Sequence, residues 1–319
     1  MNKKIAVLAG IALAGIVGGM LLFSNGGKDQ GSKGEKNIVT VTHKVGTTEV
    51  EEEPQRVVVF DWAMLDALDK LGVEGIVGVP QSATIPEYLS KYKSSEYGNI
   101  GGLKEPDLEK INELQPDLII INGRQESFYD KLTEIAPTIS MSKKDGKYLE
   151  SITNNLTIIG DIFNKEKEVE KELANINNKI NEINKVVTEK GYKATTVMAS
   201  KGELSVFGAD SRFGLIYNEL GFKNTDENIE AATHGQNVSF EYVASQDSDY
   251  MFVVDKSTIS SDKKEKSAQE LLNNDLINGS KAAKNGNIVY LDTVAWYLAD
   301  GGFTSTNMML DEVSKAINK

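Results

Sequence analysis

The chain has 319 residues, a net charge of −12 and no cysteine. This length is enough for two domains of ordinary size with substantial cores. The acidic balance argues against non-specific nucleic-acid binding, and the lack of cysteine excludes disulfides, thiol nucleophiles and cysteine metal sites.

The first 23 residues have the pattern of an export signal or a membrane anchor. Lys3 and Lys4 precede an apolar stretch from Ile5 to Phe23 that is long enough to cross a bilayer. The two lysines favour a cytoplasmic N-terminus, and the absence of a clear small-residue cleavage site favours a retained anchor. Residues 24–36 are polar and predict a flexible tether. We therefore expect an extracytoplasmic body that is tethered to the membrane.

Strand-like segments alternate with helical ones through the rest of the chain, which predicts an α/β fold. The strand-like segments lie at residues 56–60, 75–79, 118–121, 195–199, 250–254 and 287–291. Between them, residues 146–190 carry apolar side chains at helical spacing and contain no proline, so much of this run is expected to be one helix, with a local bend near Gly160 or Asn164.

These patterns divide the body into three parts. We expect an N-terminal lobe at residues 37–145, an interdomain helix at residues 146–190 and a C-terminal lobe at residues 191–319. An amphipathic helix over residues 305–318 should close the C-terminal lobe.

An internal repeat predicts that the two lobes are similar. Residues 107–121 and 239–253 each show a short helical pattern, then an aspartate and a buried strand. In both copies a glutamate comes eight residues before that aspartate, at Glu109 and at Glu241. Chance similarity between two common helix–strand units is the alternative.

The repeat also pairs two cationic positions. Arg124 follows the aspartate of the first copy by seven residues, and Lys256 follows that of the second by seven. Ligands of open α/β sheets bind beyond the carboxyl ends of the strands, so facing lobes would direct both cations into one cleft. Trp62, which comes directly after the first strand, is expected to form an apolar wall of this cleft.

The positions of the arginines in the sequence also favour a binding site in this cleft. The chain has only three arginines among 35 basic residues, and Arg124 and Arg212 each lie in a glycine-bearing loop after a strand-like run. A planar, always-charged guanidinium in a lysine-rich chain favours a specific binding role. The alternative is two structural arginines that cap loops.

From about residue 37 to its C-terminus, the sequence resembles ABC-importer substrate-binding proteins with two lobes joined by a rigid helix, the class III architecture with Rossmann-like lobes. In particular it resembles the ferric catecholate siderophore-binding proteins of the enterobactin and petrobactin type. The segments that carry the resemblance are VVVFDWAMLDALDKLGV, GGLKEPDLEKINELQPDLIIINGRQ, GADSRFGLIYNELGF, AATHGQNVSFEYV and VAWYLADGG.

The resemblance implies roles for five residues around an anionic iron complex. The three cations of the family match Arg124, Arg212 and Lys256, where lysine replaces the usual arginine and so loses the planar fork. A histidine and a tyrosine that bind Fe³⁺ directly when the siderophore is tetradentate match His234 and Tyr297. Taken alone, a histidine in the position of His234 is more often a loop residue than a metal ligand, and Tyr297 also fits a core aromatic residue whose hydroxyl is satisfied internally.

The resemblance also implies the partners. A glutamate on each lobe, Glu109 and Glu241, docks on the ABC permease dimer, with Glu105 as a competitor for Glu109. Without the resemblance, the simplest interpretation of Glu109 and Glu241 is structural, because the N-terminal end of a short helix favours a carboxylate. We expect a monomer with no intrinsic cofactor, whose ligand is a ferric siderophore. Members of the family often carry a lipid-bearing cysteine after the signal segment. This chain has no cysteine, so we expect it to be held at the membrane by its N-terminal segment.

Haem binding, metal capture and enzymatic activity are the other functions to consider. Haem binding by the same architecture is the main alternative, because histidine and tyrosine also serve as haem ligands. Capture of zinc or manganese is disfavoured, since the chain has only two histidines. No nucleophile–base motif, phosphate-binding loop or metalloprotease motif is present, so we do not expect an enzyme.

Overall fold

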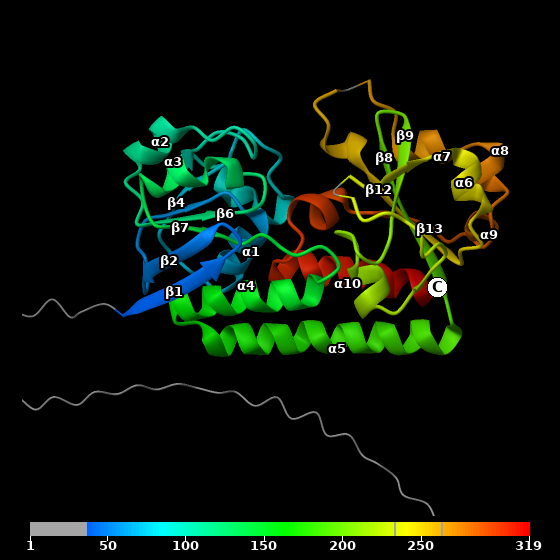
Figure 1. Cartoon of the computed structure of the whole chain (residues 1–319), viewed down its shortest axis with the longest axis horizontal. Helices are drawn as coiled ribbons and strands as arrows, with labels where there is room; N and C mark the ends of the chain where they lie inside the picture. Colours follow the sequence, from blue (N-terminus) through cyan, green and yellow to red (C-terminus); the bar gives the residue numbers. More distant parts are fainter. Residues whose placement is uncertain (1–36, 233, 263) are drawn as a thin grey trace, which may run out of the picture. The chain divides into compact units, whose positions relative to one another are not determined.

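The computed structural model describes residues 37–232, 234–262 and 264–319 (Figure 1). The predicted anchor and tether lie outside these residues. Within the described ranges, no helix is both long and apolar enough to span a membrane. The predicted lobe boundaries stay a prediction, and each lobe contains one large sheet.

The N-terminal lobe is built on a five-stranded parallel sheet in the order β5-β4-β3-β6-β7. An antiparallel hairpin of β1 and β2 packs beside β7. The strands are β1 (Ile38–His43), β2 (Gly46–Glu51), β3 (Val57–Val59), β4 (Ile76–Val79), β5 (Gly98–Asn99), β6 (Leu118–Ile121) and β7 (Thr138–Ser140). The helices are α1 (Trp62–Lys70), η1 (Glu87–Lys93), α2 (Leu108–Glu113), η2 (Glu126–Phe128) and α3 (Tyr129–Thr133).

The C-terminal lobe has a mixed sheet in the order β11-β9-β8-β12-β13, with β10 also paired to β8. Its strands are β8 (Lys193–Ser200), β9 (Glu203–Phe207), β10 (Lys223–Asn224), β11 (Gln236–Val238), β12 (Tyr250–Asp255) and β13 (Ile288–Leu291). Its helices are η3 (Leu215–Glu219), α6 (Phe240–Ser245), η4 (Lys256–Ile259), α7 (Ala268–Leu272), α8 (Asp275–Asn278), α9 (Lys281–Lys284), η5 (Val294–Leu298) and α10 (Phe303–Ile317). Every predicted strand is found, and the α/β prediction is confirmed.

Two helices, rather than one dominant helix, connect the lobes. Helix α4 (Tyr148–Phe163) ends at Asn164, which has a left-handed backbone (φ 53°), and α5 (Glu166–Lys190) follows. Asparagine tolerates this conformation and often ends helices in this way. The bend expected near Asn164 is therefore a full break, and α5 lies along both α4 and α10 (Figure 1).

The aspartates of the internal repeat perform the same structural task in both lobes. The Asp117 carboxylate accepts hydrogen bonds from the backbone N–H groups of Gln55 and Arg56, at 2.7 and 2.8 Å, just before β3. The Asp249 carboxylate accepts one from the N–H of Lys193, at 2.9 Å, where β8 begins. Each aspartate thus holds the start of the parallel strand beside its own.

Helix α10 is attached to the N-terminal lobe by a buried carboxylate. Asp66 of α1 accepts hydrogen bonds from the backbone N–H groups of Thr304 and Ser305, at 3.1 and 2.8 Å, in the first turn of α10. These N–H groups lack partners within their own helix, so the carboxylate satisfies them. Gly302 allows this approach, because a Cβ there would overlap the Asp66 carboxylate and lie 2.7 Å from the carbonyl oxygen of Ala63.

We predict that Gly302→Ala destabilises the protein by about 1–3 kcal/mol, the usual cost of overpacking a buried site. Gly102→Ala is the matched control, because a Cβ at Gly102 meets nothing within 4 Å. Denaturant unfolding of both variants measures the difference. Equal stability of the two variants would contradict the proposed close packing of α1 against α10.

Candidate ligand-binding cleft

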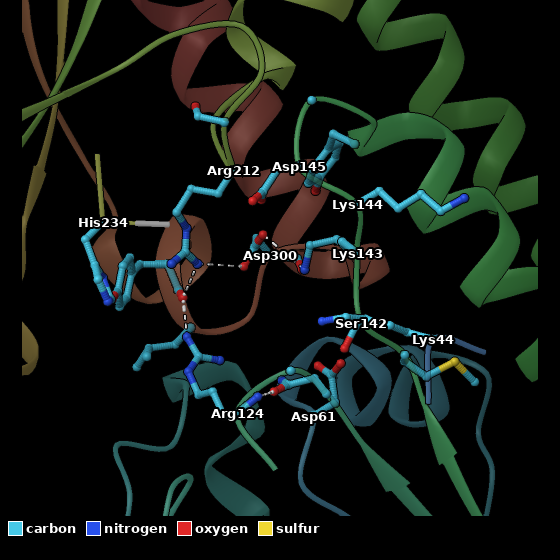
Figure 2. A pocket seen from close by; sticks show the side chains of 18 of the residues that line it. Lys44, Asp61, Arg124, Ser142, Lys143, Lys144, Asp145, Arg212, His234 and Asp300 are labelled. Atoms are coloured by element: carbon cyan, nitrogen blue, oxygen red, sulfur yellow. Dashed lines mark hydrogen bonds and ion pairs between the residues drawn. The ribbon is translucent and has the colours of Figure 1, made fainter. Parts of the chain in front are cut away.

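A cavity of about 390 Å³ lies where the carboxyl ends of β3, β6 and β7 approach loops of the C-terminal lobe; we call it the cleft cavity (Figure 2). This is the expected position for a ligand in an open α/β sheet. Its lining residues are Lys44, Asp61, Lys104, Asn122, Gly123, Arg124, Met141, Ser142, Lys143, Lys144, Asp145, Gly146, Tyr148, Ser211, Arg212, His234, Tyr297, Leu298 and Asp300.

One arginine from each lobe binds the same backbone oxygen. The guanidinium groups of Arg124 and Arg212 each donate a hydrogen bond through Nη2 to the carbonyl oxygen of Tyr297, at 2.9 and 3.0 Å. Tyr297 lies in η5, a single π-helical turn that ends at Leu298, and such turns are frequent at functional sites. Because η5 ends one residue later, the Tyr297 carbonyl has no partner within the turn and can accept from both arginines.

The same two arginines and Lys256 lie around the Tyr297 side chain. The guanidinium carbon of Arg212 lies 4.1 Å from the centre of the Tyr297 ring, and that of Arg124 lies 5.8 Å away. The Nζ atom of Lys256 lies 5.2 Å from the same ring centre, although Lys256 is not a lining residue of the cleft cavity. The predicted cations from the two lobes thus meet around one tyrosine.

This concentration of charge changes the acidity of Tyr297. Burial by itself raises the pKa of a phenol, because it disfavours the charged form. The positive charges of Arg212, Lys256 and Arg124 act in the opposite direction and bring the pKa of Tyr297 below its ordinary value. The phenolate, an anionic oxygen donor, is accordingly easier to form here than in solution.

His234 and Tyr297 line the same cavity. His234 is exposed, and Figure 2 shows it on the side of the cavity opposite Lys144. Among the described residues, no group of three histidine, cysteine, aspartate or glutamate side chains is arranged to hold a metal ion.

The prediction for Trp62 is wrong. Its side chain is 0 % exposed and belongs to the hydrophobic core, and it does not line the cleft cavity. The reason is that α1 begins at Trp62 and is buried along most of its length, so the residue that faces the cavity is Asp61. Asp61 also caps α1 by accepting a hydrogen bond from the N–H of Ala63, at 2.8 Å.

Several charged residues of the cavity were missed by sequence reasoning. Lys143 donates from Nζ to the backbone oxygen of Asp300, at 2.7 Å, and forms an ion pair with its carboxylate at 3.1 Å. The same buried carboxylate lies 3.9 Å from Arg212. The signal that could have found Lys143 is its position just after a strand, but β7 has only three residues and was not predicted.

Glu109 and Glu241 lie outside the cleft cavity. Both are exposed in the first turn of equivalent short helices, α2 and α6 (Figure 1). The caps of these helices are also equivalent, since Asp107 and Ser239 each accept a hydrogen bond from the backbone N–H three residues later. This placement is equally compatible with a helix-end role and with a docking role.

We predict that Tyr297 ionises at lower pH than an ordinary tyrosine. Lys256→Gln should raise its pKa, because one of the three positive charges that favour the phenolate is removed. Ultraviolet difference spectra recorded during a pH titration measure phenolate formation. Tyr297→Phe should delete the earliest step, whereas Tyr290→Phe should not, because burial raises the pKa of Tyr290. An unchanged first step in Tyr297→Phe would refute the assignment.

Comparisons with known proteins place the chain in a family. Residues 57–295 match the family model described as periplasmic binding protein. The petrobactin-binding protein YclQ of Bacillus subtilis is 40% identical over 322 residues, covering 99% of this chain and 100% of that protein. Its crystal structure superposes with a TM-score of 0.84, at 42% identity, covering 89% of this chain and 100% of that chain.

Two further binding proteins are similar to this chain in sequence or in structure. The catecholate-siderophore binding protein VctP of Vibrio cholerae has a TM-score of 0.83 at 37% identity, covering 88% of this chain and 100% of its own. The ferric-anguibactin-binding protein FatB of Vibrio anguillarum is 32% identical over 282 residues, covering 87% of each chain. These are binding proteins and not enzymes, as predicted, and the chain belongs to the periplasmic binding protein family.

Proposed function

We propose that this protein binds a ferric catecholate siderophore, of the petrobactin-like or bis-catecholate kind, in the cleft cavity and delivers it to an ABC importer. The observation that carries the proposal is the meeting of Arg124, Arg212 and Lys256 around Tyr297. The names of YclQ and VctP, a petrobactin-binding and a catecholate-siderophore binding protein, support the ligand class.

The chemistry of the cations suits this ligand. Ferric iron prefers anionic oxygen, and deprotonated catechols supply it, so the complex carries negative charge on electron-rich rings. Guanidinium groups offer charge-assisted hydrogen bonds to the oxygens and cation–π contact with the rings. A single cation at 4 Å contributes about 4 kcal/mol of gross attraction at an effective dielectric of 20, before desolvation.

Arg212 has an unused donor for such a ligand. Its Nε atom is buried and has no hydrogen-bond partner among the described residues, while its Nη2 is held by Tyr297. Unsatisfied buried donors are rare in folded proteins and frequently mark a site that a ligand or water completes. A catecholate oxygen is an acceptor of the required kind.

A tetradentate siderophore leaves two of the six iron positions open. His234 and Tyr297 line the same cavity and are proposed to fill them, an imidazole nitrogen and a phenolate oxygen. The lowered pKa of Tyr297 supports this role, because the phenolate is the form that binds iron. Lys256 keeps the charge of the usual arginine and lacks its planar fork, so we expect it to attract the complex without bidentate contacts.

The delivery step involves the membrane. We propose that the N-terminal segment tethers the protein outside the cytoplasm, since the chain has no cysteine that a lipid could modify. A monomer would then dock on the permease dimer through Glu109 of one lobe and Glu241 of the other. Their exposure and their equivalent positions in α2 and α6 support a two-point contact.

Binding of a ferric bis-catecholate complex tests the function. We expect it to quench the fluorescence of Trp296, which is adjacent to Tyr297, and to produce a charge-transfer band from phenolate to iron. Arg212→Gln should weaken binding at least tenfold, because it removes a charge-assisted contact and the Coulomb attraction of one cation. A folded protein that shows neither quenching nor a new band would refute the proposal, and a Soret shift with haemin instead would favour haem.

The double variant His234→Ala, Tyr297→Phe provides the control for iron coordination. It should weaken the tetradentate complex much more than a hexadentate tris-catecholate complex, which needs no protein ligand. Equal losses for both complexes would remove His234 and Tyr297 from the iron shell and leave the cationic site intact.

Charge reversal tests the docking surface. Glu109→Lys combined with Glu241→Lys should leave siderophore binding unchanged and reduce iron uptake by cells, because repulsion replaces attraction at both contacts. Exposed Glu168 and Glu170 of α5, reversed in the same way, are the matched control. Normal uptake with the first pair would contradict the docking role.

A further inference from the structure

A second cavity of about 470 Å³ adjoins the cleft cavity on the side away from His234; we call it the side cavity. It lies between the tip of the β1–β2 hairpin, the segment after β7 and the N-terminal half of α4. Lys44, Ser142, Lys143 and Lys144 line both cavities, so the two cavities share a wall of polar side chains.

The lining of the side cavity differs from that of the cleft cavity. It consists mainly of hydroxyl, amide and ammonium groups, with Ile158 as its one purely aliphatic residue and His43 as its one ring. Neither of the two arginines of the cleft cavity lines it, and Tyr297 does not line it either. It therefore lacks the guanidinium groups that would hold a catecholate ring, and it suits a hydrophilic, non-aromatic group.

The charge of the side cavity favours an anion. Three lysines line it, and Glu150 is its one carboxylate. Two of the lysines are engaged, Lys44 with Glu126 at 2.7 Å and Lys143 with Asp300 at 3.1 Å. The Lys144 ammonium has no ion pair within the described part of the chain.

Lys143 and Lys144 point in different directions, so only one of them is held by an ion pair with Asp300. Figure 2 shows Lys143 directed towards Asp300 and Lys144 directed away from it. In addition, the Nδ1 atom of His43 is buried and has no hydrogen-bond partner among the described residues. The side cavity thus contains one exposed cation without an ion pair among the described residues, Lys144, which is able to meet an anionic ligand group, whereas the buried Nδ1 atom of His43 is closed to solvent.

We propose that the side cavity binds a carboxylate carried by the non-aromatic linker of the siderophore, with the Lys144 ammonium as its anchor. The inference rests on the proposed function, because the linker reaches the side cavity only when the catecholates occupy the cleft cavity. It makes Lys144 a specificity-determining residue, which separates ligands by the charge of their linker and not by their iron centre.

A matched pair of synthetic ligands tests this inference. The ferric complex of bis(2,3-dihydroxybenzoyl)lysine has a free carboxylate on its linker, and the carboxamide of the same compound is neutral there. Wild-type protein should bind the carboxylate complex about fivefold to tenfold more tightly, as expected for one charge-assisted hydrogen bond at a partly exposed site. Fluorescence titration of both complexes gives the ratio of dissociation constants.

Three variants identify the residue responsible. Lys144→Gln should bring the ratio to about one by weakening only the carboxylate complex. Glu150→Gln should increase the ratio, because it removes the one negative charge of the side cavity. Lys104→Gln is the matched control: Lys104 lines the cleft cavity alone, so its loss should weaken both complexes equally.

The outcomes distinguish this inference from the proposed function. If neither complex binds to the wild-type protein, the proposed function fails. If both bind with equal affinity, or if Lys144→Gln weakens both to the same extent, the side cavity does not recognise the linker and the proposed function stands.

Discussion

The site depends on one constraint, the attachment of two arginines from different lobes to a single carbonyl oxygen. Arg124 and Arg212 both donate to the backbone of Tyr297, which fixes their guanidinium groups before any ligand arrives. Binding to a cavity whose charges are already in place requires little ordering of side chains, and this lowers the entropic cost of association. Tyr297 is the second-last residue of η5, and the carbonyl oxygens at a helix end have no partner within the helix, so this oxygen can accept both arginines.

Three cations around one ring repel one another, and the fold compensates for this repulsion locally. The Asp300 carboxylate lies near Arg212 and pairs with Lys143, so part of the positive charge is balanced within the protein. Burial raises the pKa of Asp61, and the nearby Lys143 ammonium opposes that rise. The carboxylates neutralise part of the charge of the neighbouring cations, and this limits the repulsion between the cations when no ligand is bound. The cavity still keeps an excess of positive charge, which suits an anionic ligand.

The sequence predicted the elements whose signals are local, together with the repeat. Apolar runs predicted the central strands, and the seven-residue spacing from Asp117 and Asp249 predicted that Arg124 and Lys256 correspond. Trp62 was misplaced because position after a strand does not say whether a helix begins at once and buries the side chain. Lys143 and Asp300 were missed because their meeting depends on tertiary packing between segments more than 150 residues apart.

The acceptor shared by the two arginines belongs to the main chain, and this has a consequence for substitutions at position 297. A backbone oxygen is present whatever amino acid occupies position 297, so substitution there leaves the anchoring of both guanidinium groups untouched. The side chain at position 297 can therefore change without removing the acceptor that holds the two arginines in the cleft cavity. The proposed coordination of iron by the Tyr297 side chain and the placement of the two positive charges thus rest on different atoms of one residue and can be altered separately.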